Sequence, residues 1–132
     1  MSAACDVLVV DDERVVADAI RLVLGDAGLT VETVPDAEAA LGHPALARCR
    51  LVICDMMLPG QSGLDAVRAM HERRPGLPIV VITGYATPAH EEQALGSGAA
   101  AFLPKPFDDS ELLDLVRRVL DRTEGAGEAR RT

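Results

Sequence analysis

Residues 51–55 read Leu-Val-Ile-Cys-Asp, a short apolar run that ends on a carboxylate. Residues 7–10 and 79–82 form two more runs that are nearly continuous in apolar character and rich in valine or isoleucine, and a fourth run covers residues 99–103. Each run has the length of one strand, and uninterrupted apolar strands are typical of a parallel sheet covered on both faces. Residues 30–34 alternate polar and apolar side chains, which predicts a half-exposed edge strand.

Helix signals fill the segments between these runs. Apolar residues recur at helical spacing from Val16 to Ala27, and Gly28 marks the expected end of this helix. Further helices are expected over residues 36–46 and after three capping signals, namely Ser62 with Asp65, Thr87 before Pro88, and Asp108 with Glu111. Strand and helix therefore alternate five times, which predicts an α/β fold with a parallel sheet and helices on both faces.

One compact domain is expected over residues 1–122, since the chain of 132 residues is long enough for a single hydrophobic core. Residues 123–132 are polar and rich in small residues, so they predict a flexible tail or the stub of a linker. No apolar run has the length that spans a bilayer, so membrane insertion is not expected, and the first residues lack the pattern of a secretory signal.

Charge and cysteine content narrow the class of protein further. The formal net charge of −8 repels phosphate backbones, and three aromatic residues leave little surface on which bases could stack, so direct nucleic-acid binding is not expected. Cys5, Cys49 and Cys54 are odd in number and form no Cys-x-x-Cys pair, which favours reduced thiols that behave as small apolar residues. Together with the absence of a secretory signal, these thiols predict a cytoplasmic protein.

Polar residues that could react or bind a ligand follow four of the five predicted strands. Asp11 and Asp12 follow the first apolar run, Asp55 the run at 51–54, Thr83 the run at 79–82, and Lys105 comes shortly after residue 103. Ligands of open parallel sheets bind beyond the carboxyl ends of the strands, so these side chains are expected to converge there. Taken singly, Asp12 reads as a helix cap, Thr83 as a turn residue and Lys105 as a loop lysine, but their coincidence favours a common site.

The chemistry of this set points to phosphoryl transfer. Three close carboxylates raise one another's pKa, and a divalent cation such as Mg²⁺ or Mn²⁺ together with Lys105 relieves this repulsion. Asp55 ends a buried strand outside any capping context, so it is the expected nucleophile. Lys105 and the hydroxyl group of Thr83 are suited to bind phosphoryl oxygens.

The chain resembles the receiver domains of two-component response regulators, of the stand-alone, single-domain type. The resemblance rests on four motifs in order: Val-Val-Asp-Asp-Glu at 9–13, Cys-Asp-Met-Met-Leu-Pro-Gly at 54–60, Val-Ile-Thr-Gly-Tyr at 81–85 and Leu-Pro-Lys-Pro-Phe at 103–107. It runs from about Cys5 to about Leu120. It implies a flavodoxin-like, doubly wound sheet of five strands in the order 2-1-3-4-5, with five helices.

The resemblance also implies a role for each site residue. Asp55 would be the phosphoacceptor, while Asp11, Asp12, Asp55 and the backbone carbonyl of Met57 would hold the metal ion. Thr83 would hydrogen-bond the phosphoryl group, and Lys105 would contact that group or the unmodified Asp55. The bond between Lys105 and Pro106 is expected to be cis.

Three further residues take their roles from the resemblance alone. Phe102 occupies the position of the aromatic residue that rotates when the threonine moves, although it also fits a plain core residue. Met57 and Tyr85 occupy positions that tune dephosphorylation. Such a domain is no enzyme beyond catalysing its own phosphorylation and dephosphorylation.

The implied partners are a histidine kinase or a histidine phosphotransfer protein. A downstream target would bind the surface formed by the helix after Thr87, the strand at 99–103 and the last helix, and phosphorylation would also favour a homodimer.

Three rival functions fit the sequence less well. A haloacid dehalogenase-type phosphatase needs Asp-x-Asp after its first strand, whereas residues 11–13 read Asp-Asp-Glu. A flavin-binding module needs a hydroxyl-rich phosphate loop at the same place, where the acidic residues would repel phosphate. A receiver domain that no longer accepts phosphate would lack some of the five site residues, and all five are present.

Overall fold

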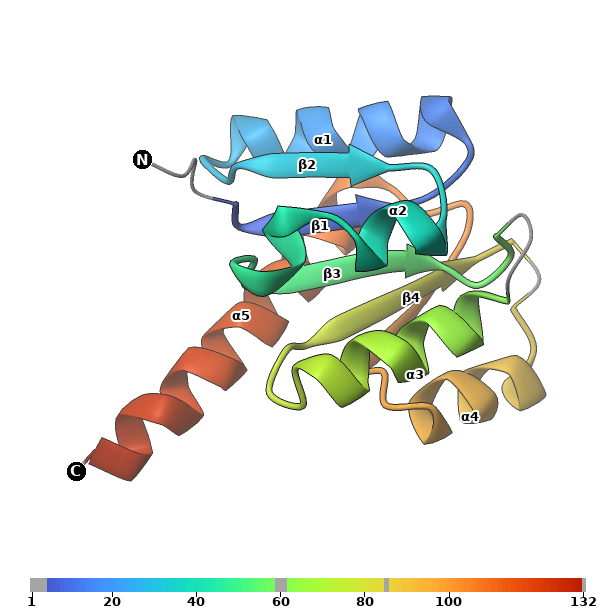
Figure 1. The fold of residues 1–132 in the computed structure, drawn as a ribbon. Coiled ribbons are helices and arrows are strands. Elements are labelled where there is room, and N and C mark those ends of the chain that lie inside the picture. The colour runs from blue at the N-terminus through green and yellow to red at the C-terminus, as the bar shows by residue number, and fades with distance from the viewer. Residues whose placement is uncertain (1–4, 59–61, 85, 132) are drawn as a thin grey trace.

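The computed structural model describes residues 5–58, 62–84 and 86–131, and for residues 123–131 it describes the backbone alone. Its sheet has five parallel strands in the order β2-β1-β3-β4-β5, as predicted (Figure 1). The strands are β1 (Val7–Val10), β2 (Val31–Val34), β3 (Leu51–Asp55), β4 (Ile79–Thr83) and β5 (Ala101–Pro104). The alternating segment forms β2, which is an edge strand with one buried residue, so its predicted half-exposed character is confirmed.

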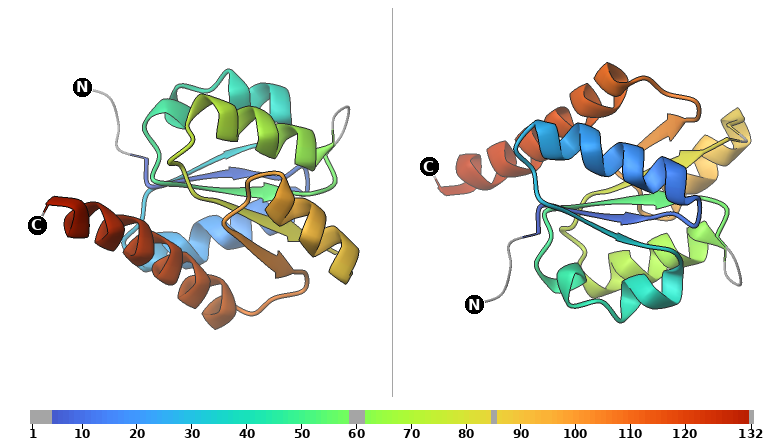
Figure 2. Two further views of the ribbon diagram at one scale, coloured as in Figure 1. Left: turned by 90° about the horizontal axis from the view of Figure 1, so that it is seen from below. Right: turned by 90° about the horizontal axis from the view of Figure 1, so that it is seen from above.

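Helices cover both faces of the sheet (Figure 2). They are α1 (Arg14–Asp26), α2 (Ala37–Leu41), the 3-10 helix η1 (Pro44–Ala47), α3 (Gly63–Arg73), α4 (Pro88–Gly96) and α5 (Asp109–Arg131). The buried side chains of α1 and α5 pack on one face, and those of α2, α3 and α4 pack on the other. The resulting three-layer α/β arrangement is the doubly wound, flavodoxin-like fold that the sequence predicts.

Strand β1 shows how the sequence produces two cores. Val7 and Val9 point into the layer with α1 and α5, while Leu8 and Val10 point into the layer with α2, α3 and α4. All four side chains are fully buried. A strand that is buried on both sides must be apolar at every position, and burying each such side chain contributes about 1.5–3 kcal/mol.

The expected capping residues begin the later helices. Ser62 accepts a hydrogen bond from the amide of Leu64 at 3.1 Å, and Thr87 accepts one from the amide of His90 at 3.1 Å. Asp108 and Glu111 each accept a hydrogen bond from the other's amide, which is the reciprocal arrangement of a capping box. These bonds satisfy amides that would otherwise lack a partner in the first turn, so they fix where each helix leaves the carboxyl edge of the sheet.

The single helix expected over residues 36–46 is wrong. Asp36 caps a short α2, accepting from the amide of Ala39 at 2.8 Å, but this helix stops at Leu41 and η1 starts at Pro44. Proline has no amide donor and disfavours a helical conformation in the residue before it. His43, which precedes Pro44, is accordingly extended, with φ −84° and ψ 132°.

Helix α5 (Asp109–Arg131) continues into residues 123–131, for which the sequence predicts a flexible tail or a linker stub. Its last turns extend away from the sheet (Figure 1). The assignment of residues 123–132 to a tail outside the compact domain stays a prediction.

Candidate functional site

Three aspartates meet where β1 and β3 end. Val10 of β1 pairs with Cys54 of β3, so Asp11 and Asp55 follow at neighbouring positions on adjacent strands. Each of Asp11, Asp12 and Asp55 can offer a carboxylate oxygen within 4.8 Å of those of the other two. Asp11 and Asp55 are each only 3% exposed, whereas Asp12 faces solvent. The arrangement thus joins two buried carboxylates to one that is open to water.

Hydrogen bonds hold both carboxylate oxygens of Asp55. The amide of Met57 donates to Oδ1 at 3.0 Å, and Nζ of Lys105 donates to Oδ2 at 3.1 Å. Met57 itself follows β3 with its side chain exposed. Asp55 therefore lies in a fixed position at the end of a buried strand, with its carboxylate turned toward the common site.

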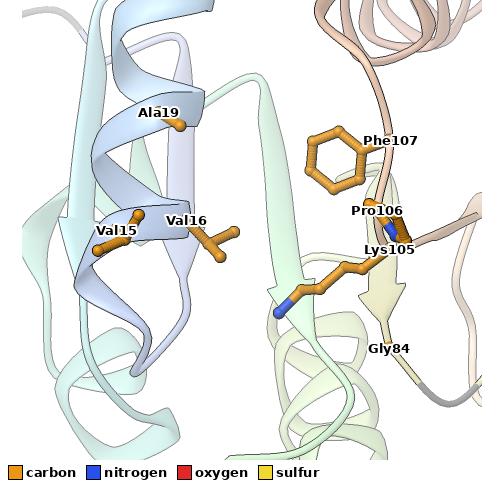
Figure 3. Close-up of a pocket in the computed structure, with 7 residues that line it drawn as sticks. All are labelled: Val15, Val16, Ala19, Gly84, Lys105, Pro106 and Phe107. Atoms are coloured by element: carbon orange, nitrogen blue, oxygen red, sulfur yellow. The ribbon is translucent and has the colours of Figure 1, made fainter.

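Lys105 reaches the site from the end of β5, the outermost strand beside β4. It follows β5, its backbone amide donates to the carbonyl of Thr83 at 2.7 Å, and its bond to Pro106 is cis, as predicted. Figure 3 shows its side chain extending from the segment with Pro106 toward the ends of the central strands. Its ammonium group lies 2.9 Å from Oε1 of Glu13 and 3.3 Å from Oδ2 of Asp11, in addition to its contact with Asp55.

These carboxylates determine the charge state of Lys105. Burial opposes the charged ammonium group, but the hydrogen bond to Glu13 and the charges of Asp55 and Asp11 outweigh this effect and raise the pKa of Lys105. The ammonium group is therefore charged at neutral pH and available to an incoming phosphoryl oxygen.

Asp11 carries an unsatisfied oxygen that suits a metal ion. Its Oδ1 accepts the amide of Glu13 at 2.9 Å, but among the described residues its buried Oδ2 accepts no hydrogen bond, although Lys105 lies within ion-pair distance. Burial raises the pKa of Asp11 to about 6, and the negative charge of Asp55 adds to this effect. Mg²⁺ prefers carboxylate oxygens and water, so the orphaned Oδ2 beside two more carboxylates fits that ion.

Thr83 and Phe102 link the site to α4. Thr83 is the last residue of β4 and is fully buried. Phe102 lies in β5, is half buried and lines a hollow with residues at the start of α4, namely Ala86, Thr87, Pro88 and Glu91. It also packs against the core cluster that contains Ala94 of α4. The remaining predicted residue, Tyr85, lies outside the described residues, as do positions 59–61 of the second motif.

Two residues at the site were not predicted. Glu13 is the third acid of the motif at 9–13, and its ion pair with Lys105 could be found only from the structure. Gly63 starts α3 against the end of β3, and a Cβ atom there would contact the carbonyl of Asp55 and lie 2.6 Å from Cα of Met56. The only sequence signal for this close approach is a glycine directly after the cap Ser62.

The cysteines and the helices bear on two broader expectations. All three cysteines are free and buried, as predicted. Burial raises the pKa of Cys5 to about 11, which keeps this thiol in its neutral form. Within residues 5–58, 62–84 and 86–131, no helix combines the length and apolar character needed to cross a membrane.

The chain has many relatives among proteins of known function. Response regulator MprA of Mycolicibacterium vanbaalenii is 38% identical over 126 residues, covering 93% of this chain and 54% of that protein. C4-dicarboxylate transport transcriptional regulatory protein DctD of Pseudomonas aeruginosa is 37% identical over 123 residues, covering 90% of this chain and 26% of that protein. The chain thus spans only a quarter to about half of these two relatives.

Solved structures show the same fold over nearly the whole chain. A CheY-like response regulator receiver domain protein from Methanospirillum hungatei superposes with a TM-score of 0.86 at 28% identity, covering 94% of this chain and 99% of that one. The receiver domain of NtrX from Brucella abortus superposes with a TM-score of 0.83 at 34% identity, covering 88% of this chain and 98% of that one. The family model of the response regulator receiver domain matches residues 7–117, which include every predicted site residue. This chain therefore belongs to the receiver domains of two-component response regulators, which accept a phosphoryl group on an aspartate.

Proposed function

We propose that Asp55 is the aspartate that accepts the phosphoryl group. The observation that carries this assignment is that Asp55, alone among the described carboxylates of the site, touches both Lys105, at 3.1 Å, and the amide of Met57, at 3.0 Å. An Oδ atom of Asp55 forms the new bond to phosphorus, while the bond from phosphorus to the donor atom breaks and the donor keeps that electron pair.

Lys105 and Thr83 position the transferred group in this proposal. The ammonium group of Lys105 moves one of its hydrogen bonds from Asp55 to a phosphoryl oxygen and so neutralises part of its charge. Thr83 ends the strand next to β3, and its hydroxyl group donates to a second phosphoryl oxygen. Placing these groups in advance supplies most of the catalysis that such a transfer needs.

Receiver domains bind Mg²⁺, and the acidic cluster is suited to hold it. In this proposal Asp11, Asp12 and Asp55 are the side-chain ligands, and the backbone carbonyl of Met57 is a further ligand. Mg²⁺ or Mn²⁺ would supply positive charge that neutralises the carboxylates and the incoming phosphoryl oxygens. Orphaned Oδ2 of Asp11 supports this assignment, because a buried carboxylate oxygen without a hydrogen bond is costly in the metal-free protein.

Receiver domains interact with histidine kinases or histidine phosphotransfer proteins, and such a protein in the cytoplasm would supply the phosphoryl group here. In this proposal phosphorylation alters the surface of α4, β5 and α5, to which a target protein or a second copy of the chain binds. Met57 is 58% exposed beside Asp55 and has no polar group that could orient a water molecule. Slow hydrolysis of the phosphorylated form follows, to which Tyr85 is also expected to contribute.

Phosphorylation with acetyl phosphate and Mg²⁺ tests the assignment of Asp55. Intact-mass spectrometry should show one phosphoryl adduct that hydroxylamine removes, and Asp55→Asn should show none, because its amide is a poor nucleophile. Asp65→Asn, at an exposed aspartate of α3, is the control and should be modified like the wild type. A phosphorylated Asp55→Asn variant, or turnover of simple phosphate esters by the wild type, would contradict the proposal.

A further inference from the structure

Glu13 has no role in the proposed transfer, yet it is the nearest partner of Lys105. Its Oε1 lies 2.9 Å from Nζ of Lys105, compared with 3.1 Å for Asp55 and 3.3 Å for Asp11. The side chain of Glu13 is 59% exposed, whereas those of Asp55 and Asp11 are 4% and 0% exposed. Lys105 is thus shared between one carboxylate that faces solvent and two that are buried.

The position of Glu13 ties it to both sides of the site. It is the N-cap residue of α1, but within the described residues its side chain makes no capping hydrogen bond, and it reaches Lys105 instead. Its backbone amide donates to Oδ1 of Asp11 at 2.9 Å. Glu13 therefore connects the segment after β1 to a lysine that arrives from β5, and this lysine forms one wall of the hollow beside α1 (Figure 3).

The functions of Asp55 and Asp11 require that the ammonium group of Lys105 does not fully occupy their carboxylate oxygens. Asp55 must present a free lone pair to phosphorus, and a cation at the site needs the oxygens of both Asp55 and Asp11. Each hydrogen bond or close ion pair from Lys105 to these oxygens competes with those tasks. A third carboxylate on the solvent side takes up one of the three donors of the ammonium group and part of its charge.

We propose that Glu13 is a positioning residue that holds the ammonium group of Lys105 at the solvent side of the site and so leaves Asp55 and Asp11 available for the cation and the phosphoryl group. This inference rests on the assignment of Asp55 as the phosphoacceptor. Glu13 acts through Lys105 in this proposal, so its effect can be separated experimentally from a general effect of negative charge.

Two substitutions separate the contact from the charge. Glu13→Gln keeps the length of the side chain and removes its charge, while Glu13→Asp keeps the charge and is one methylene too short for the same contact with Lys105. Aspartate is also a favoured N-cap residue, so a role limited to starting α1 would leave Glu13→Asp at least as good as the wild type. Glu38→Gln, at an exposed glutamate in the first turn of α2, is the matched control.

Calorimetric titration with Mg²⁺ and the maximal rate of phosphorylation by acetyl phosphate provide the two measurements. In both Glu13 variants the dissociation constant for Mg²⁺ should rise by about two- to fivefold, the size expected for a partly exposed ion pair, and the maximal rate should fall by a similar factor. Glu38→Gln should match the wild type in both. Wild-type behaviour of Glu13→Asp would overturn the proposal, because the contact would then be unimportant.

A double-mutant cycle with Lys105→Gln identifies the route of the effect. Glu13→Gln should no longer change Mg²⁺ affinity when Lys105 is already replaced, since the proposed action passes through its ammonium group. An undiminished effect in that background would overturn the proposal in favour of direct attraction of the cation by Glu13. The Mg²⁺ titrations need no phosphoryl transfer, so failure of the wild type to accept phosphate would reject the function of Asp55 without deciding the role of Glu13.

Discussion

Burial makes the charged form of Asp11 unfavourable in the folded protein. Its carboxylate is fully buried, and only one of its oxygens accepts a hydrogen bond from a described residue. Ionisation of such a group is unfavourable until a cation arrives, so the metal-free protein is under electrostatic stress that binding relieves. Asp12 shares the cluster but is exposed, so water can stabilise its charge.

The raised pKa of Asp11 predicts an unusual dependence of stability on pH. Because the pKa is raised by burial to about 6, the folded protein takes up a proton more readily than the unfolded chain does. The charged carboxylate of Asp11 therefore lowers the stability of the folded protein, and this loss is fully present above about pH 6. It disappears as the pH falls from there toward 3.8, the ordinary pKa of an aspartate. Without divalent cations, the free energy of unfolding should therefore rise by about 1.4 kcal/mol between about pH 7.5 and about pH 5.

Urea unfolding of the metal-free protein across this pH range measures the effect. Asp11→Asn should remove most of the rise, and Asp114→Asn, at an exposed aspartate of α5, should keep it. Partial burial of Asp6 opposes its charge, but hydrogen bonds with Thr30 and Arg50 outweigh this effect and lower its pKa. Asp6 therefore loses its contribution to stability only at lower pH and does not interfere with the measurement. Parallel curves for Asp11→Asn and the wild type would show that another group is responsible.

Single residues also show what the sequence could and could not predict at the site. The convergence of Asp11, Asp12, Asp55, Thr83 and Lys105 follows from where each strand ends, because parallel strands bring their carboxyl ends to one edge. Glu13 could not be assigned in this way. An exposed glutamate after two aspartates is also an ordinary residue before a helix, and only side-chain geometry pairs it with a lysine 92 positions away.

At the scale of elements, the junction of β3 and α3 is the tightest part of the site. The amide of Gly63 donates to the carbonyl of Met56 at 2.9 Å, so the first turn of α3 lies directly against the end of β3. Only a residue without Cβ fits there, since that atom would lie 2.6 Å from Cα of Met56 and also contact the carbonyl of Asp55. Strand β3, which ends in the proposed phosphoacceptor Asp55, and α3 are therefore positioned together.

Gly63→Ala should displace this junction. The added methyl group has backbone on its near side, which cannot give way as a flexible side chain would, so a destabilisation of about 2 kcal/mol or more is expected. Phosphorylation by acetyl phosphate should slow as well, because Asp55 adjoins the clash. Gly25→Ala in α1 is the matched control: its Cβ meets nothing within 4 Å, and helix propensity predicts a gain of about 0.5–1 kcal/mol. Equal effects of the two substitutions in urea unfolding would refute the argument.

The elements also show the limit of sequence patterns. Strand runs and capping residues located nearly every helix and strand, since both signals act over a few residues. The prediction of one helix over residues 36–46 was wrong because the alanine and leucine residues there are compatible with a continuous helix. The break between α2 and η1 depends on the extended residue before Pro44. A helical pattern alone likewise could not show that α5 continues to Arg131.

At the scale of the whole molecule, the site connects to one side of the sheet by short covalent and packing links. Thr83 ends β4, and four residues later Thr87 caps α4. The amide of Lys105 bonds the carbonyl of Thr83, so β5 is tied to the same point. Phe102 of β5 lies against the start of α4. In contrast, β2 lies on the other side of β1 in the strand order, and neither β2 nor α2 carries a proposed contact to the phosphoryl group.

This asymmetry predicts where phosphorylation changes the molecule. A phosphoryl group shifts a conformational equilibrium only by binding the two states with different affinity, and here the difference would come from its bonds to Thr83 and Lys105. Thr83 precedes α4 by four residues, and Lys105 follows β5 and bonds the carbonyl of Thr83. Hydrogen exchange on addition of the phosphoryl mimic beryllofluoride should therefore change most within residues 86–120. Residues 31–47, which contain β2, α2 and η1, should change least and provide the internal reference.

The variant Asp55→Asn, treated with beryllofluoride in the same way, separates a response at the site from adventitious binding elsewhere and should show no change. Thr83→Ala should still bind the mimic through Lys105 but should show a smaller change in α4, because one of the two bonds that distinguish the states is lost. A uniform change over the whole chain, or one centred on β2 and α2, would mean that the signal leaves the site by another route. In that case the contact of Phe102 with α4 would be core packing alone, which is the other role that its position in β5 allows.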